Sequence, residues 1–134
     1  MKYAIRYYTK SGNTKKLADA IAEVLNIEAK LISEELEEDV DILFLGSSIY
    51  GSSIDPSVKN FFNNINVNIG LLVNFSTAGI MQSSYNQIKD ICNNNEIPIS
   101  ADEFHCPGSF AGMNKNRPDE ADIENIKNFT RKFL

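Results

Sequence analysis

The sequence predicts an α/β fold, a doubly wound parallel sheet of five strands with helices on both faces. Three observations lead to it. Apolar, β-rich runs alternate with segments whose apolar residues recur every three or four positions, the period of a helix. Small, polar segments that contain glycine follow three of these runs. Strands that alternate with helices form a parallel sheet, and 134 residues with 43% hydrophobic content suit one domain, residues 1–134.

Five runs are predicted as strands. The run at 41–46 is continuously apolar, which is typical of a strand that is buried on both faces. Pro98 makes the start of the last strand irregular, because proline has no backbone N–H to donate. The predicted strands comprise residues 2–8, 27–32, 41–46, 70–75 and 97–104.

Four segments are predicted as helices. Pro56 suits the first position of the second helix, with Asp55 before it as the N-cap. The acidic segment 34–41 predicts a solvated connection with a short helix or none. The apolar faces of the four helices comprise Leu17, Ala18, Ile21, Val24 and Leu25; Val58, Phe61, Phe62 and Ile65; Tyr85, Ile88 and Cys92 within 81–94; and Ile126, Phe129 and Phe133 after Pro118.

Charge and composition exclude several function classes. The net charge of −5 argues against nucleic acid and anionic membranes as partners and suits docking to a basic protein. No apolar stretch is as long as a membrane span, and the N-terminus has no signal-peptide layout, so the cytoplasm is the expected location. Cys92 and Cys106 are expected as free thiols. The single histidine, His105, leaves little room for a metal site or a Ser-His-Asp triad.

Residues 9–14, Thr-Lys-Ser-Gly-Asn-Thr, join the first strand to the first helix. Their hydroxyl groups can donate to phosphate oxygens, and Gly12 lets the backbone turn tightly so that N–H groups point inward. The start of the helix adds a partial positive charge. This segment therefore predicts a phosphate site built mainly from neutral donors. The alternative is an ordinary capped turn with Asn13 or Thr14 as the N-cap.

Three other classes with related architecture are excluded. The chain has no G-x-G-x-x-G, so it is not expected to bind a dinucleotide in the Rossmann manner, and it has no G-x-x-x-x-G-K-[ST] of a P-loop. A response-regulator receiver needs acids at the ends of its first and third strands. Here these ends read Tyr-Tyr-Thr at 7–9 and Leu-Gly-Ser-Ser at 45–48.

Three segments together resemble the flavodoxin family: T-x-S-G-N-T at 9–14, G-S-S-I-Y-G at 46–51 and F-S-T-A-G at 75–79. The resemblance spans nearly the whole chain in order and spacing. It implies the strand order 2-1-3-4-5 and noncovalent binding of FMN. The first segment then binds the FMN phosphate, and the other two flank the isoalloxazine ring. The cofactor-binding residues implied in this way are Thr9, Lys10, Ser11, Gly12, Asn13, Thr14, Ser48, Ile49, Tyr50, Gly51, Ser76, Thr77, Ala78 and Gly79.

Some positions have a more specific implied role. Tyr50 is the expected aromatic neighbour of the flavin, and Gly51 follows it where a peptide can turn over at little cost. The third segment lacks the acidic and aromatic stretch that short-chain flavodoxins usually carry there. The loop at 105–117 is long enough to predict a role of its own. Phe110 and Met113 are expected to cover the flavin, to dock a partner or to anchor this loop.

Electron transfer is the function that the resemblance implies. The chain is expected to receive electrons from a reductase or ferredoxin-like donor and to pass them to an acceptor enzyme, with no catalytic or metal-binding residues of its own. It has no nicotinamide-binding motif, so a separate donor is needed. One alternative is a small FMN-dependent oxidoreductase that acts directly on a quinone or similar small molecule. Another is a flavin-free interaction domain that keeps only the fold.

Overall fold

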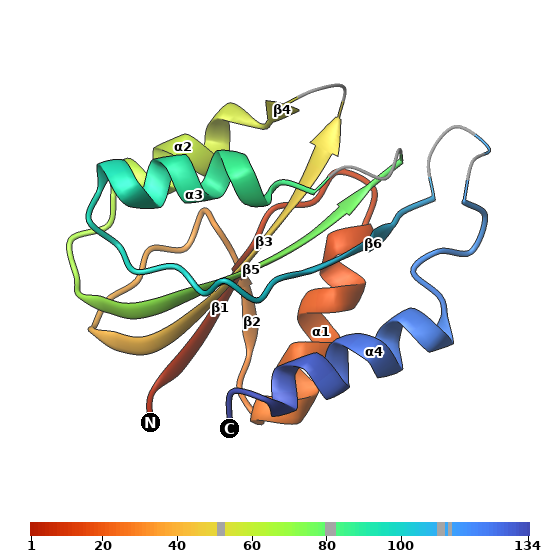
Figure 1. The fold of residues 1–134 in the computed structure, drawn as a ribbon, viewed down its shortest axis with the longest axis horizontal. Helices are drawn as coiled ribbons and strands as arrows, with labels where there is room; N and C mark the ends of the chain where they lie inside the picture. The colour runs from red at the N-terminus through yellow and green to blue at the C-terminus, as the bar shows by residue number, and fades with distance from the viewer. Residues whose placement is uncertain (51–52, 80–82, 110–111, 113) are drawn as a thin grey trace.

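A computed structural model describes residues 1–50, 53–79, 83–109, 112 and 114–134. In chain order its elements are β1 (Tyr3–Tyr7), α1 (Asn13–Leu25), β2 (Ala29–Leu31), β3 (Val40–Tyr50), β4 (Ser53–Ile54), α2 (Pro56–Asn63), β5 (Ile69–Ala78), α3 (Tyr85–Asn94), β6 (Phe104–Pro107) and α4 (Glu120–Arg131). The sheet lies between two layers of helices, with α1 and α4 on one face and α2 and α3 on the other (Figure 1). The predicted α/β class is confirmed.

The sheet follows the path β2-β1-β3-β5-β6, and all neighbours on this path are parallel. The sequence predicts five strands in the order 2-1-3-4-5. The described sheet differs by a sixth strand, β4, which pairs antiparallel with the end of β3 and shifts the numbering of the strands after it. The extra strand arises because the chain turns back on β3 before it enters α2.

The two central strands, β3 and β5, run further than the sequence predicts. Their pairing extends from Val40 opposite Ile69 to Ile49 opposite Ala78, beyond the predicted ends at 46 and 75. Small hydroxyl residues such as Ser47 lack the apolar pattern of a strand, but their backbone groups still pair with the neighbouring strand. The second and third predicted loops therefore begin as strand.

The last predicted strand is displaced. β6 begins at Phe104, where the predicted strand 97–104 ends. The described backbone hydrogen bonds of the preceding stretch to β5 are at Leu72, whose N–H donates to Pro98 O and whose carbonyl accepts from Ser100 N, both at 2.8 Å. Pro98 cannot donate to a ladder, which explains why this stretch is not a regular strand.

The helix starts agree with the sequence in one case and differ in two. Pro56 is the first residue of α2 and Asp55 caps it, which confirms that prediction. α3 begins at Tyr85 rather than at 81, because the serines before it bond to side chains and to the Tyr85 N–H. α4 begins at Glu120 rather than at 118, since Asp119 is its N-cap.

Each face of the sheet has its own core layer. The two layers share no side chains, because successive residues of a strand point to opposite faces. Fully buried residues in the layer under α1 and α4 include Ile5, Leu17, Phe44, Phe75 and Ile126, and those in the layer under α2 and α3 include Leu43, Leu45, Val58, Leu72 and Ile88.

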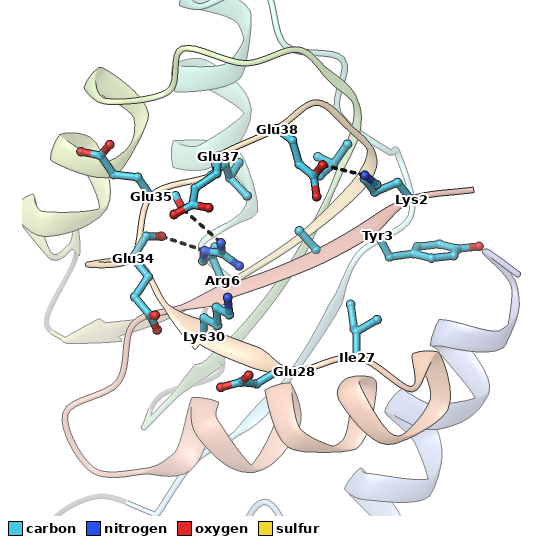
Figure 2. Close-up of a pocket in the computed structure, with 13 residues that line it drawn as sticks. Lys2, Tyr3, Arg6, Ile27, Glu28, Lys30, Glu34, Glu35, Glu37 and Glu38 are labelled. Carbon is cyan, nitrogen blue, oxygen red and sulfur yellow. Dashed lines mark hydrogen bonds and ion pairs between the residues drawn. The ribbon is translucent and has the colours of Figure 1, made fainter.

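The connection from β2 to β3, residues 32–39, contains no helix, which is one of the two outcomes that the acidic segment 34–41 predicts. Val40 and Asp41, the last residues of that predicted segment, already belong to β3. Arg6 of β1 lies in the sheet under this connection and is 7% exposed. Its Nε donates to Glu34 O at 2.8 Å and its Nη2 donates to Glu35 O at 3.2 Å (Figure 2). Leu36 adds an apolar contact to the core layer on the same face. A buried arginine and one leucine thus cover the part of the sheet where a crossover helix usually lies.

The start of α4 combines a capping box with an ion pair. Asp119 Oδ1 accepts from Asp122 N at 3.0 Å, and Asp122 Oδ2 accepts from Asp119 N at 2.9 Å. The Arg117 guanidinium donates to both oxygens of Asp122, at 2.6 and 2.8 Å. The hydrogen bond from Arg117 lowers the pKa of the Asp122 carboxyl, with the Asp119 N–H and the Arg117 charge acting in the same direction against the opposing effect of burial.

The replacement Asp122→Asn is expected to lower the free energy of unfolding at pH 7 by about 1–2 kcal/mol, because the box and the ion pair are both weakened. The lowered pKa means that the charged carboxylate stabilises the fold above its unfolded pKa of 3.8, and that this stability is lost as the pH falls through the folded pKa. Urea unfolding between pH 2 and 7 should show the gap between wild type and variant closing below about pH 4. Asp90→Asn, at an exposed position of α3, is the matched control; a gap that stays constant with pH would contradict this account.

Candidate functional site

The first predicted segment forms the turn into α1. Gly12 is the N-cap residue, with φ 90°, and its N–H donates to Thr9 Oγ1 at 2.9 Å. Among the described residues no side chain caps α1 and its first turn has no acid, as is also true of α3, whereas aspartates cap α2 and α4. The alternative of a capped turn with Asn13 or Thr14 as the N-cap is therefore wrong. The first N–H groups of α1 lack side-chain acceptors, as in an anion site.

Charge at this turn also favours an anion. Lys10 and Ser11 are both exposed beside the start of α1. A lysine at a helix N-terminus is unfavourable by itself, because the helix dipole is positive there. A bound phosphate would reverse that balance, since it would accept from the hydroxyl, the ammonium and the helix N–H groups together.

A triad of hydroxyl groups joins the three predicted segments below this turn. Thr14 Oγ1 lies 2.6 Å from Ser48 Oγ and 3.0 Å from Thr77 Oγ1, and the last two lie 3.2 Å apart. All three side chains are at most 2% exposed. The sequence predicts each of them at the cofactor, one from each segment. The structure brings them together in one hydrogen-bonded ring.

Two neighbours of this triad were not singled out by the sequence. Ser47 is fully buried, and its Oγ has no hydrogen-bond partner, the one such buried side-chain atom among the described residues. A Cβ at Gly46 would lie 2.3 Å from the Phe75 ring and 2.9 Å from Thr14 Cγ2. Gly46 thus lets β3, β5 and the start of α1 approach closely. Only the small size of these residues signals this in the sequence.

Asn13, a predicted phosphate ligand, is largely buried and points elsewhere. Its Nδ2 donates to Ser109 O at 3.0 Å, so the side chain ties the start of α1 to the segment after β6. One of its two amide hydrogens is thus used within the protein. No sequence signal marks this contact, because the two residues are 96 positions apart.

The remaining predicted residues divide into three groups. Ile49 is 4% exposed within the core and pairs with Ile54 of β4, so its described contacts are packing contacts. Tyr50 ends β3, and the prediction for Gly51 lies outside the described residues, as do those for Phe110 and Met113. The residues of the third segment, Ser76, Thr77, Ala78 and Gly79, form and follow the end of β5.

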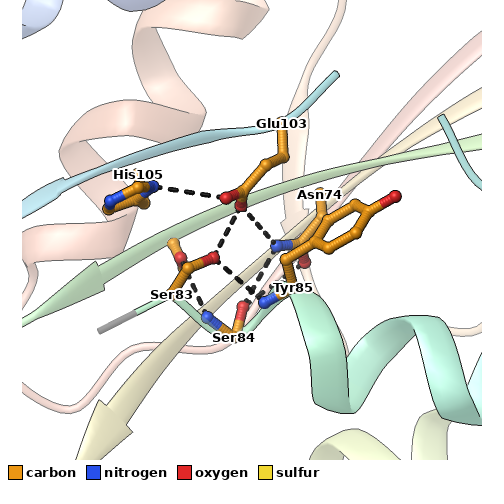
Figure 3. A network of polar contacts seen from close by, with 7 residues as sticks. Asn74, Ser83, Ser84, Tyr85, Glu103 and His105 are labelled. Carbon is orange, nitrogen blue, oxygen red and sulfur yellow. Dashed lines mark hydrogen bonds and ion pairs between the residues drawn. The ribbon is translucent and has the colours of Figure 1, made fainter. Parts of the chain in front are cut away.

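The third segment is fixed from the side by a polar network (Figure 3). Ser83 Oγ donates to Glu103 Oε2 at 2.6 Å, and Ser84 N donates to Ser76 Oγ at 3.4 Å. His105 Nδ1 lies 3.3 Å from Glu103 Oε1. The network links Ser83 and Ser84, the residues just before α3, to Ser76 of β5 and to Glu103 beside β6. The described partner of His105 is thus Glu103, which also belongs to this network.

The two thiols are free and buried, and the described side chains form no metal site. Cys92 and Cys106 are free, as predicted, and both are buried. Burial raises the pKa of each thiol to about 12, so neither is a nucleophile at neutral pH. No group of histidine, cysteine or acidic side chains in the described part of the chain could hold a metal ion.

None of the described helices is long and apolar enough to cross a membrane.

Chemistry rather than pocket size distinguishes this edge of the sheet. A pocket of about 450 Å³ surrounds Arg6 and the acidic connection (Figure 2), and another of about 450 Å³ lies between that connection and α2. The hollow at the hydroxyl triad measures only about 10 Å³. It is nonetheless where residues from all three predicted segments meet, and its lining comprises Asn13, Ser48, Ile49, Thr77, Ala78, Gly79, Gly108 and Ser109.

Known proteins place these features in a family. The model of the flavodoxin domain matches residues 4–98. An uncharacterized protein of Methanocaldococcus jannaschii is 30% identical over 136 residues, which cover 91% of this chain and 90% of the relative. Among solved structures, a flavodoxin from the domain Archaea superposes with a TM-score of 0.80 at 16% identity, covering 98% of this chain and 95% of the other. Oxidised flavodoxin 1 from Bacillus cereus superposes with a TM-score of 0.76 at 18% identity and covers 99% and 97%.

The similarities in structure and in sequence support different conclusions. The solved structures have low sequence identity and so support the fold, whereas the family model and the relative rest on the sequence itself. Both extend over most of the chain. The chain therefore belongs to the family of flavodoxin domains.

Proposed function

We propose that this chain binds FMN noncovalently, as one domain spanning residues 1–134, and carries electrons between protein partners. The membership of the flavodoxin family suggests a flavin-dependent redox function. The observation that carries the proposal is the meeting of three segments at one edge of the sheet, with the uncapped start of α1 beside the hydroxyl triad. Ligands of doubly wound sheets bind at this edge.

The residues present suit the parts of FMN. The exposed Ser11 and Lys10, with the first N–H groups of α1, form a donor set for a phosphate monoester. The ends of β3 and β5 lie side by side and would border the ring on its inner side. When bound, FMN supplies reversible electron transfer, and the protein positions it and adjusts its potential.

The proposed partners are proteins rather than small substrates. The described lining of the hollow at this edge consists of hydroxyls, amides, backbone groups and apolar side chains, and none of these side chains titrates near neutral pH. The net charge of −5 favours docking to basic surfaces, and the sequence has no nicotinamide-binding motif. We therefore propose a reductase or ferredoxin-like donor, an acceptor enzyme and a cytoplasmic location.

A visible spectrum recorded during anaerobic stepwise reduction tests the proposal. Purified protein with added FMN is expected to retain the flavin on gel filtration and to take up electrons in two resolved one-electron steps. It should then pass them to a redox partner protein. Protein that retains no flavin would contradict the proposal. Rapid turnover of NAD(P)H and a quinone without a separate reductase would show instead that the protein is an oxidoreductase acting on small molecules.

A further inference from the structure

The described residues Gly108, Ser109 and 114–117, which we name the strap, cross the same edge of the sheet. The strap is closed at its base, where Ser109 N donates to Arg117 O at 2.8 Å and Arg117 N donates to Asn114 O at 3.0 Å. The ion pair of Arg117 with Asp122 holds this base against α4. The strap therefore has a defined conformation where it is described.

The strap binds both carbonyl groups at the end of the third segment. Gly108 N donates to Ala78 O at 2.9 Å, which continues the pairing of β6 with β5. Asn114 Nδ2 donates to Gly79 O at 2.7 Å. Asn114 has φ 52°, in the left-handed region that asparagine tolerates better than most residues. The Asn114 side chain thus donates to a carbonyl just beyond the last residue pair of β5 and β6.

The same strap also binds the first segment. Asn13 Nδ2 donates to Ser109 O at 3.0 Å. A Cβ at Gly108 would lie 2.8 Å from Asn13 Nδ2 and 3.3 Å from Thr77 Cβ. Both distances are shorter than ordinary van der Waals contact, so glycine at this position lets the strap lie close to both segments. Among the described residues, the strap is the segment outside the sheet that bonds to both the turn before α1 and the end of β5.

We infer that Asn114, through the strap, is a positioning residue for the proposed flavin site, fixing the third segment relative to the first. The inference rests on the proposed function, because positioning matters only if a flavin lies between these segments. The strap also commits the Ala78 and Gly79 carbonyls to protein donors. Loss of the Asn114 amide frees the Gly79 carbonyl, so both the affinity for FMN and the reduction potential should change.

A pair of asparagines in the strap provides a matched test. Asn114→Gly removes the side-chain donor but keeps a residue that tolerates positive φ. Asn116→Gly is its control, because Asn116 also has positive φ, 64°, is exposed, and makes none of the contacts to Ala78, Gly79 or Asn13 described above. The dissociation constant for FMN is expected to rise roughly tenfold in Asn114→Gly, equivalent to about 1.4 kcal/mol, and to change less than about twofold in Asn116→Gly.

The reduction potentials separate positioning from simple stabilisation. Asn114→Gly is expected to shift the flavin potentials while Asn116→Gly leaves them unchanged, and thermal unfolding of both flavin-free variants shows whether they are folded. If Asn114→Gly does not fold, Asn114→Ala removes the donor without adding a charge and takes its place. Wild-type affinity and potentials in the Asn114 variant would overturn the inference. Wild-type protein that binds no FMN would instead overturn the proposed function and this inference with it.

Discussion

Gly46→Ala is expected to lower the free energy of unfolding by about 2–3 kcal/mol, the largest effect on stability among the substitutions considered for this protein. The new Cβ would lie 2.3 and 2.4 Å from two atoms of the Phe75 ring and 2.9 Å from Thr14 Cγ2. Phe75 and Thr14 are both fully buried, so neither can move without displacing the core under α1. Urea unfolding of the flavin-free protein measures the effect.

Two comparisons isolate the steric cause. Gly112→Ala puts the same methyl group in open space at φ 82°, so it should cost only about 1 kcal/mol of backbone strain. In Gly46→Ala combined with Phe75→Leu, the clashing ring atoms are gone. The double variant should therefore be more stable than the sum of the two single losses by at least about 0.5 kcal/mol. Additive losses would show that the ring is not the obstacle.

The fold was predictable where local patterns determine it. Alternating strand and helix patterns are local, and they predict the α/β class and the layers of helices. Pro56 with Asp55 before it predicts the start of α2 correctly, because N-cap and first-position preferences act within a few residues. The acidic segment 34–41, which predicts a short helix or none, likewise agrees with a connection that contains no helix.

The ends of the central strands were not predictable in this way. Ser47, Ser48 and Thr77 have the composition of a loop, yet they lie in strands because β3 and β5 satisfy each other's backbone groups. That pairing joins residues about 30 positions apart, so no local pattern contains it. The displaced β6 has a similar cause, since Pro98 interrupts the ladder and the strand forms only where β5 still offers partners.

The candidate site shows the same division. The residue types at 9–14 predict a turn suited to phosphate, and the uncapped start of α1 agrees with them. The sequence does not reveal that the Asn13 side chain is committed to Ser109, or that Asn114 binds Gly79. Both contacts join distant parts of the chain through a single amide. Contacts of this kind leave no local pattern in the sequence, whereas the segment 9–14 can be recognised from its hydroxyl residues and glycine.

A variant that carries both Ser11→Ala and Thr14→Val is expected to weaken FMN binding by about 3 kcal/mol, or more than 100-fold. Ser11 is exposed at the turn, where its hydroxyl would donate directly to the phosphate in a charge-assisted hydrogen bond. Thr14 is fully buried, and its hydroxyl forms the triad with those of Ser48 and Thr77. Valine keeps the shape of Thr14 and removes only the hydroxyl. Isothermal titration of flavin-free protein with FMN measures both single variants and the double variant.

Two controls decide what each hydroxyl does. Ser33→Ala, at an exposed serine of the 32–39 connection, should leave the FMN affinity unchanged. Thr77→Val opens the same triad without altering the first segment. If it weakens FMN binding as much as Thr14→Val does, the triad acts by holding the three segments together and Thr14 is not a phosphate donor. If Ser11→Ala binds FMN as tightly as wild type, the Ser11 hydroxyl does not donate to the phosphate, and the binding energy of this turn comes from Lys10 and the N–H groups of α1.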